Sequence, residues 1–251
     1  MIGAIIGDIV GSRFEFDNIR TKKFELFTMG SNFTDDSVMT VAVADALINN
    51  KDATSTLQYY GRKYPGRGYG GRFYSWIYND NPKPYNSCGN GAAMRISSVG
   101  YIAKTPEEVK ELSKKVTEVT HNHAEGIKAA EVTAMCIYMA LHDFSKEQIE
   151  EYAIKEYPVI KNFDYEDLRK NYRFSELSQE SVPQAIYCFL ISKNFEDCLR
   201  TTISIGGDCD TTAAISCAIA EAYYKKIPSK IVQQAKILLP IEFINILEKI
   251  N

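Results

Sequence analysis

Apolar side chains recur at helical spacing along most of this chain of 251 residues. Patterns that alternate apolar and polar residues, which are typical of strands, are scarce. We therefore predict an all-α fold. The predicted helices cover residues 36–49, 123–142, 182–193, 195–204, 211–225, 229–239 and 241–249.

Two further helices are predicted from their start signals. Thr105 is a suitable N-cap, Pro106 takes the first helical position, and Glu108 completes a capping-box pattern. Ser145 and Gln148 repeat the capping-box spacing. These signals predict helices that begin just after residues 105 and 145.

Two predicted helices are too apolar to face water. Residues 213–220 are apolar on all sides but small, which suits a central helix that several neighbours approach closely, and residues 38–48 share this character. Glycines at positions 3, 7 and 11 would form a flat helical stripe for close packing. The chain shows no composition shift, repeat or long linker, although residues 61–90 read as a long irregular excursion. We expect one domain over residues 1–251.

Composition limits the partners and the compartment. The chain is 45% hydrophobic and 24% charged, with a net charge of -3, so it has no basic field of the kind that nucleic-acid binding uses. Six cysteines form no Cys-x-x-Cys pair, which favours a reducing compartment. No signal peptide or membrane-spanning run is recognised. We expect a cytoplasmic protein without a nucleic-acid or membrane partner.

Two acidic clusters carry the candidate chemistry. Thr34, Asp35 and Asp36 open one of the apolar helices, and the sequence Gly-Gly-Asp-Cys-Asp-Thr at residues 206–211 opens the other. Helix capping explains either cluster taken singly, but the two clusters hold more oxygen acceptors than capping requires. If both helices share one core, four carboxylates meet, and such a set requires protons, solvent or cations. Because the ligands are oxygens, Mg²⁺ or Mn²⁺ is favoured over zinc.

Three other segments are weaker candidates. Residues 88–95 form a glycine-rich turn before a helix, which either binds an anion or is only a turn. His121 and His123 precede a helix, where capping by Thr120 or Asn122 is the simpler explanation. Residues 59–78 combine aromatic side chains with arginines, which either stack a base and neutralise phosphates or form a self-packed loop.

Taken together in this order, five motifs resemble the ADP-ribosylglycohydrolase family, which includes the dinitrogenase reductase-activating glycohydrolases. They are Gly-Asp-x-x-Gly-x-x-x-Glu at residues 7–15, Thr-Asp-Asp-Ser at 34–37, Gly-Asn-Gly-x-Ala-Met-Arg at 89–95, Thr-His-x-His-x-Glu-Gly at 120–126 and Gly-Gly-Asp-x-Asp-Thr at 206–211. The resemblance implies a compact all-α domain with a binuclear magnesium site, sometimes occupied by manganese, that hydrolyses the bond between ADP-ribose and a modified group.

The resemblance also implies roles for individual residues. Glu15 would lie on a mobile loop beside the metals and gate the site or assist catalysis. The metal ligands would be Thr34, Asp35, Asp36, Asp208, Asp210 and Thr211. The residues lining the ADP-ribose cleft would be Asn90, Gly91, Met94, His121 and His123.

Cleavage of a glycosidic bond requires an activated water and a stabilised oxocarbenium-like transition state. Our hypothesis is that Asp35, Asp36 or Glu15 accepts the proton of that water. The substrate would be ADP-ribose linked to a protein side chain or a small acceptor, and residues 62–78 are the candidate loop for choosing the acceptor. Two other functions stay open: a non-catalytic ADP-ribose-binding or structural protein, and a magnesium-dependent nucleotide phosphohydrolase.

Overall fold

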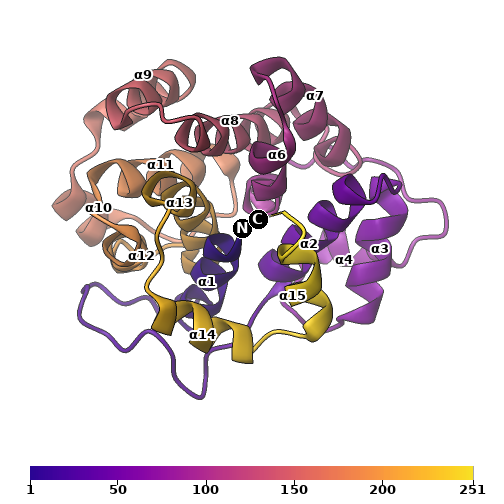
Figure 1. Cartoon of the computed structure of the whole chain (residues 1–251), viewed down its shortest axis with the longest axis horizontal. Coiled ribbons are helices and arrows are strands. Elements are labelled where there is room, and N and C mark those ends of the chain that lie inside the picture. The colour runs from indigo at the N-terminus through magenta and orange to yellow at the C-terminus, as the bar shows by residue number, and fades with distance from the viewer. Residues whose placement is uncertain (251) are drawn as a thin grey trace.

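The computed structural model describes residues 1–250, which form helices and loops without a sheet. One isolated antiparallel bridge joins Gly89 to Leu177. The helices, shown in Figure 1, are α1 (Ile2–Gly11), η1 (Ser12–Phe14), α2 (Asp35–Ile48), α3 (Ala53–Lys63), α4 (Gly71–Ile77), α5 (Gly91–Met94), α6 (Ser97–Ile102), α7 (Pro106–Thr117), α8 (Ala124–Leu141), α9 (Lys146–Glu156), η2 (Pro158–Asn162), α10 (Tyr165–Asn171), η3 (Ser178–Glu180), α11 (Val182–Ile191), α12 (Phe195–Ser204), α13 (Cys209–Tyr224), α14 (Ser229–Ile237) and α15 (Ile241–Leu247).

The all-α prediction is therefore confirmed. Every helix predicted from apolar spacing is present, and its ends differ from the predicted ones by no more than two residues. Among residues 1–250, no helix combines the length and the apolar character that crossing a membrane requires.

Helices α1 and α13 pack against each other at the centre of the molecule (Figure 1), and glycines make this possible. A Cβ atom on Gly7 would lie 2.2 Å from the backbone oxygen of Ala213, and one on Gly11 would lie 2.6 Å from the Cα atom of Asp210. Both separations are shorter than any tolerable contact, so only glycine fits. The predicted glycine stripe is confirmed, and it presses α1 against the acidic start of α13.

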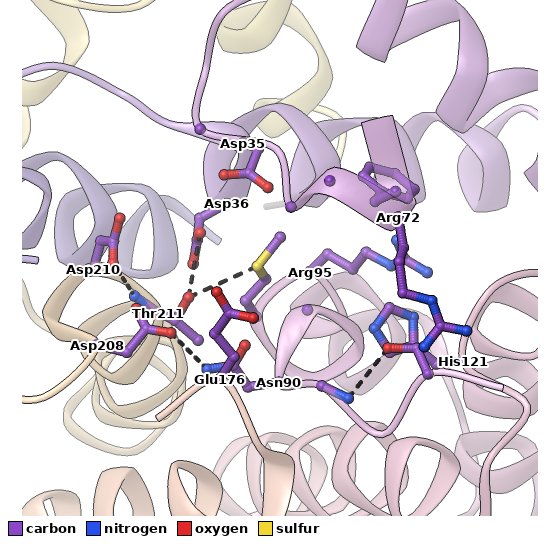
Figure 2. Close-up of a pocket in the computed structure, with 18 of the residues that line it drawn as sticks. Asp35, Asp36, Arg72, Asn90, Arg95, His121, Glu176, Asp208, Asp210 and Thr211 are labelled. Carbon is purple, nitrogen blue, oxygen red and sulfur yellow. Dashed lines mark hydrogen bonds between the residues drawn. The ribbon is translucent and has the colours of Figure 1, made fainter. Parts of the chain in front are cut away.

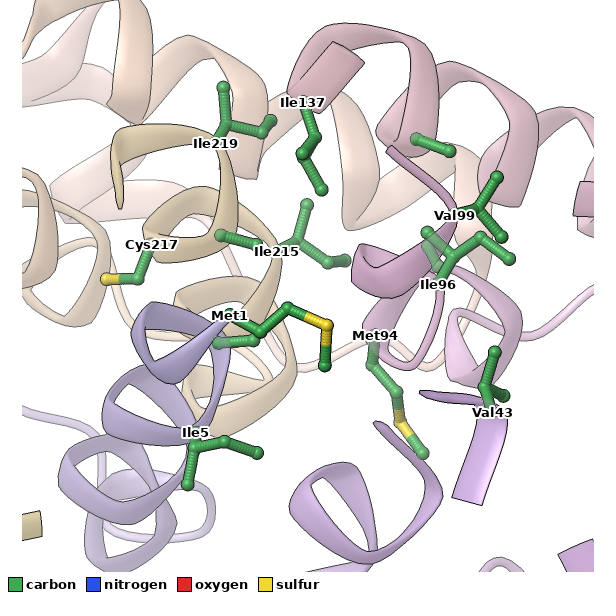
Figure 3. Packing of buried hydrophobic residues seen from close by; sticks show 14 of the residues in the cluster. Met1, Ile5, Val43, Met94, Ile96, Val99, Ile137, Ile215, Cys217 and Ile219 are labelled. Carbon is green, nitrogen blue, oxygen red and sulfur yellow. The ribbon is translucent and has the colours of Figure 1, made fainter. Parts of the chain in front are cut away.

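The apolar core joins helices from the whole length of the chain. In Figure 3, Met1, Ile215 of α13 and Met94 of α5 converge on one space, with Ile137 of α8 beside them. All of these side chains belong to one continuous buried cluster. Buried methyl and methylene groups stabilise the fold through the area that they remove from water. The core thus fixes α13 and α5 relative to each other, and both helices carry residues of the site described below.

The two predicted capping boxes have different outcomes. Ser145 and Gln148 form the complete reciprocal box at the start of α9. At α7, the Thr105 side chain accepts a hydrogen bond from the Glu108 amide, as predicted. The Glu108 carboxylate, however, accepts from the amide of Lys104. The predicted reciprocal bond to Thr105 is replaced by a bond one residue earlier.

Residues 61–90 are more ordered than the predicted irregular excursion, because α3 ends within them and α4 lies wholly inside them. Trp76 is buried in the core, and Arg62 donates to the backbone oxygen of Ile77. Part of the segment is therefore structural, and the aromatic residues that fill it pack inward as well as outward.

Candidate active site

The two acidic clusters meet, because α2 and α13 both direct their N-termini into one cleft. The cleft is lined by Asp35 and Asp36 from α2, by Asp208, Asp210 and Thr211 from the start of α13, and by Glu15, which follows η1. Asp36, Asp208 and Asp210 are each no more than 5% exposed. In Figure 2 these side chains lie together on one side of the cleft.

Two glycines with positive φ allow the chain to enter α13. Gly206 and Gly207 have φ angles of 72° and 81°, a backbone region that favours glycine. A Cβ atom on Gly207 would also lie 2.2 Å from the ring of Tyr172. The Gly-Gly-Asp motif thus places Asp208 as the residue immediately before α13.

A further carboxylate, Asp8 of α1, organises the start of α2. Asp8 is fully buried and accepts hydrogen bonds from the amides and hydroxyls of both Thr34 and Ser37. The Thr34 hydroxyl donates to Asp8 over 2.7 Å and also accepts from the amide of Asp36 as the N-cap of α2. Asp8 is therefore a positioning group that fixes the two aspartates following Thr34.

The carboxylates lie close enough together to bind the same cation. Carboxylate oxygens of Glu15, Asp208 and Asp210 all lie within 4.8 Å of one another. The Thr211 hydroxyl lies 3.4 Å from Oδ2 of Asp36, which links the two helix starts. Oδ1 of Asp36 is buried and has no hydrogen-bond partner among the described residues.

Burial and mutual repulsion disfavour the charged forms of this cluster. The pKa values of Asp35, Asp36 and Asp210 are raised well above the ordinary value, first by burial and then by neighbouring carboxylates. Glu15 is only partly buried, but burial and repulsion from Asp208 raise its pKa to about 7.

The donor set suits a hard divalent cation. Its oxygens come from carboxylates and one hydroxyl, which are the ligands that Mg²⁺ and Mn²⁺ prefer. Within residues 1–250, none of the ion pairs involves a carboxylate of the cleft. The unpartnered Oδ1 of Asp36 supplies a buried acceptor that a cation would satisfy. Asp35, Asp36, Asp208, Asp210 and Thr211 thus fit a metal site. The Thr34 hydroxyl donates to Asp8 and accepts from the Asp36 amide, which leaves one lone pair, so its role as a ligand stays a prediction.

Asn90, which precedes α5, connects the acidic end to the rest of the cleft. Its side-chain amide donates to Oδ2 of Asp208 over 2.7 Å and to the Ser181 hydroxyl over 3.2 Å. Gly91 and Met94 line the cleft on the same short helix, and the Met94 sulfur lies 3.9 Å from the Thr211 hydroxyl. Asn90 therefore holds Asp208 and has little donor capacity left for a ligand.

The other end of the cleft is basic. Arg72, Arg95 and His121 lie there (Figure 2), and Tyr85 also lines the cleft. Arg95 is 1% exposed, which is rare for a charged side chain, and burial lowers its pKa to about 10. The pKa of His121 is lowered well below its ordinary value, first by burial and then by Arg95 and Arg72, so the imidazole is neutral.

Not every residue proposed from the sequence reaches the cleft. Thr34 is not among the residues that line the cleft, and its hydroxyl donates to Asp8. His123 is the N-cap of α8, where its Nδ1 accepts from the amide of Glu125. The predicted capping by Thr120 or Asn122 is replaced by this histidine cap. Of the candidate acceptor loop, residues 68 and 70–73 line the cleft, and Arg62 does not.

Several cleft residues were not predicted as site residues from the sequence. Arg95 ends the Gly-Asn-Gly motif, but a lone arginine gives no signal that it will be buried. Glu176 and Phe174 come from a polar connection before η3 and have no recognisable pattern. Asp8, which does not line the cleft but positions the start of α2, appeared in the sequence only within the Gly-Asp motif, and its partners are 26 and 29 residues away.

Comparison with protein families gives one match that spans nearly the whole chain. The sequence profile of the ADP-ribosylglycohydrolase family matches residues 1–244. A solved structure described as an ADP-ribosylglycohydrolase-related protein complex superposes with a TM-score of 0.68 and 21% identity, covering 94% of each chain. That structural likeness supports the fold.

Individual relatives agree with the family match. The ADP-ribosylhydrolase ARH3 of Mus musculus is 26% identical over 304 residues, covering 89% of this chain and 82% of the relative. The Homo sapiens ARH3 is 27% identical and covers 89% of this chain and 84% of the relative. The ADP-ribosylarginine hydrolase Tri1 of Pseudomonas putida (strain GB-1) is 24% identical, covering 89% of this chain and 69% of the relative.

Proposed function

We propose, from the premise that this chain belongs to the ADP-ribosylglycohydrolase family, that it uses divalent cations to hydrolyse the glycosidic bond of ADP-ribosylated groups. As an ADP-ribosyl glycohydrolase it acts on ADP-ribose linkages. The proposed cations are two Mg²⁺ ions. The proposed product is intact ADP-ribose. The bond cleaved joins ADP-ribose to a protein side chain or a small acceptor.

The observation that carries the proposal is the polarity of the cleft. One end gathers buried carboxylates that lack cationic partners, and the other end presents Arg72, Arg95 and neutral His121. ADP-ribose combines a reactive ribose with a diphosphate, so it can place hydroxyls at the cation end and phosphate oxygens near the basic end. A substrate without phosphate would leave the buried charge of Arg95 unused.

Asp35, Asp36, Asp208, Asp210 and Thr211 are the proposed metal ligands. When bound, divalent cations at such a site neutralise the carboxylates, orient substrate oxygens and make water more acidic. Asp8 and Asn90 keep this set in place through hydrogen bonds to the start of α2 and to Asp208.

Glu15 is the residue we propose as proton acceptor. It lies at the mouth of the cleft within 4.8 Å of the Asp208 and Asp210 oxygens, and it belongs to neither helix start. Its raised pKa makes its carboxylate a stronger base than an ordinary glutamate. In the reaction, a water oxygen bonds to C1″ of the ribose and its proton passes to Glu15, the bond from C1″ to the acceptor breaks, and this proton is passed on to the acceptor as it leaves. Asp35 and Asp36 are the alternative proton acceptors.

The experiment that tests this function is product analysis by mass spectrometry. Peptides ADP-ribosylated on arginine or on serine are incubated with the protein, with Mg²⁺ or with a chelator. We expect Mg²⁺-dependent release of intact ADP-ribose together with the unmodified peptide. The peptide that loses its ADP-ribose faster, arginine-linked or serine-linked, identifies the substrate class.

The control is the double variant Asp208→Asn, Asp210→Asn, which keeps the size of both side chains and removes two negative charges. We expect it to be inactive. Release of AMP and ribose phosphate would identify a phosphohydrolase instead. Tight binding of ADP-ribose without cleavage of either peptide would indicate a binding protein or another acceptor.

A further inference from the structure

The Thr120 hydroxyl lies between Arg95 and His121. Nη2 of Arg95 donates to Oγ1 of Thr120 over 2.7 Å, and Nδ1 of His121 lies 2.8 Å from the same oxygen. The backbone oxygen of Thr117 lies 3.5 Å away. Arg95, Thr120 and His121 are each at least 95% buried, so water does not compete for their hydrogen bonds.

The chemistry of the donors decides where the hydroxyl proton goes. A guanidinium group only donates, so Oγ1 of Thr120 must accept from Arg95. The hydroxyl then has one proton to give, either to Nδ1 of His121 at 2.8 Å or to the Thr117 oxygen at 3.5 Å. The longer separation exceeds the usual range for a hydroxyl donor, whereas the shorter one lies within it. If Nδ1 of His121 were instead the donor, the Thr120 hydroxyl would be left with only the 3.5 Å contact to the Thr117 oxygen, so the arrangement in which the hydroxyl donates to Nδ1 is favoured.

An Nδ1 that accepts this proton fixes the tautomer of the imidazole. His121 is neutral, because burial and the nearby arginines lower its pKa. A neutral imidazole carries one proton, so the proton of His121 lies on Nε2. Nε2 faces the glycine-rich turn, 3.4 Å from where a Cβ atom of Gly91 would lie, and none of residues 1–250 hydrogen-bonds to it.

We propose that Thr120, held by Arg95, is a positioning residue that fixes His121 as the Nε2–H tautomer, so that the cleft presents a donor to an oxygen of the bound nucleotide. The contacts that fix the tautomer lie within the protein and do not depend on the substrate. That the oxygen bound by Nε2–H belongs to a nucleotide rests on the function proposed above. The opposite tautomer would place a lone pair toward the cleft and repel a phosphate oxygen. Figure 2 shows His121 and Arg95 on the basic side of the cleft.

The tautomer is measured directly by long-range ¹H–¹⁵N NMR on the full chain loaded with Mg²⁺. The protein has three histidines, so the ring signals are assigned with His123→Gln and His142→Gln variants. We expect His121 to carry its proton on Nε2 from pH 6 to 8. In Thr120→Val, which removes the hydroxyl, we expect a mixture of tautomers, and in Thr120→Ser we expect the single Nε2–H form to return.

The control variant is Thr117→Val, one helical turn earlier. Its hydroxyl is buried and has no hydrogen-bond partner among the described residues, so its loss leaves the contacts of His121 intact. We expect the Thr117→Val tautomer to match that of the wild type. A wild-type His121 protonated on Nδ1 overturns the proposal, and this measurement needs no variant to fold.

Binding of ADP-ribose, measured by calorimetry, tests the consequence of the tautomer. A ligand that selects the Nε2–H form from a mixture binds more weakly by the inverse of that form's fraction, so we expect Thr120→Val to lose about twofold to tenfold in affinity. Thr120→Ser and Thr117→Val should bind like the wild type. Equal binding by Thr120→Val, once its tautomer is mixed, would overturn the role of the donor. Absence of ADP-ribose binding by the wild type would instead contradict the proposed function, whatever the tautomer.

Discussion

The side-chain amide of Asn90 donates a hydrogen bond of 2.7 Å to Oδ2 of Asp208, although 118 residues separate the two. The bond joins the glycine-rich turn before α5 to the start of α13. It orients one carboxylate of the acidic cluster and leaves the other oxygen of Asp208 to face its neighbours. Partners of this kind keep a ligand in position without contacting the metal themselves.

Removal of this bond should weaken the metal site. In Asn90→Ala we expect affinity for Mg²⁺ or Mn²⁺ to fall roughly tenfold to a hundredfold, as is usual when a hydrogen bond that orients a ligand is lost. Isothermal titration calorimetry with Mn²⁺ measures it. Asn171→Ala is the matched control, because Asn171 makes an equally short bond of 2.7 Å to Asp167 on the exposed surface of α10. Unchanged Mn²⁺ affinity in Asn90→Ala would contradict the positioning role.

Neutralising one buried carboxylate should separate stability from activity. Asp36→Asn resembles the protonated side chain that burial and neighbouring carboxylates favour. We expect the metal-free variant to be more stable than the wild type by about 1 kcal/mol. Turnover in saturating Mg²⁺ should fall by roughly a hundredfold or more, because the variant loses a charged ligand. Urea denaturation in a chelator and the peptide assay measure the two effects.

Asp45, on the same helix, is the control for that experiment. It is also buried, but Lys51, Asn49 and Tyr60 donate hydrogen bonds to it. Burial alone would raise its pKa, and these bonds outweigh that effect and lower it. Asp45→Asn should therefore destabilise the protein by about 1 kcal/mol and leave metal affinity unchanged. If both substitutions destabilise the metal-free protein, repulsion within the cleft is weaker than we infer.

The helices and the acidic clusters could be predicted from the sequence because both are local patterns. Residues 195–204 form α12 as predicted, and each acidic cluster opens a helix with too many apolar residues to face water. That the two clusters meet followed from placing both helices in one core. The glycines at 3, 7 and 11 supplied the close approach of α1 that completes it.

The remaining features of the site depend on contacts that no local pattern records. Arg95 is buried, and the hydroxyl that accepts its hydrogen bond belongs to Thr120, 25 residues away. Thr34 and His123 are part of the expected motifs. The Thr34 hydroxyl, however, donates to Asp8, and the His123 side chain caps α8. A motif thus predicts which residue types are present, while the side-chain partners decide which of them face the cleft.

Glu15 should make the metal-free protein less stable as the pH rises. Burial, followed by repulsion from Asp208, raises its pKa from 4.5 to about 7 in the folded protein. The folded chain therefore keeps a proton between about pH 4.5 and 7 that the unfolded chain loses, and stability falls as the pH rises through this interval. Glu15→Gln mimics the protonated form at every pH. We expect its Tm, relative to that of the wild type, to increase from pH 5 to pH 8.

Glu111→Gln, on the exposed surface of α7, is the matched control for this titration. Its Tm difference from the wild type should not grow with pH. Because metal binding requires deprotonated carboxylates, added Mg²⁺ should stabilise the wild type more at pH 8 than at pH 5. A Tm difference for Glu15→Gln that shrinks between pH 5 and 8 would show that the pKa of Glu15 is not raised.

The packing of α1 on α13 should be as important for the metal site as the ligands themselves. In Gly11→Ala, the new Cβ atom would lie 2.6 Å from the Cα atom of Asp210 and from the backbone oxygen of Cys209. Neither backbone atom can move alone, so the start of α13 must shift. We expect a loss of about 1–3 kcal/mol in the free energy of unfolding, which is typical of overpacking. Mn²⁺ affinity should fall as well, because the shift moves Asp210.

Gly30→Ala is the control for this substitution, since its Cβ atom would meet only the Thr28 hydroxyl, at 3.8 Å. Urea denaturation and Mn²⁺ calorimetry on both variants separate a general effect of alanine from the local clash. Gly30→Ala should resemble the wild type in both measurements. If Gly11→Ala loses stability but keeps full Mn²⁺ affinity, the position of Asp210 does not depend on the contact between α1 and α13. If it keeps both, the two helices have more room than the structure shows.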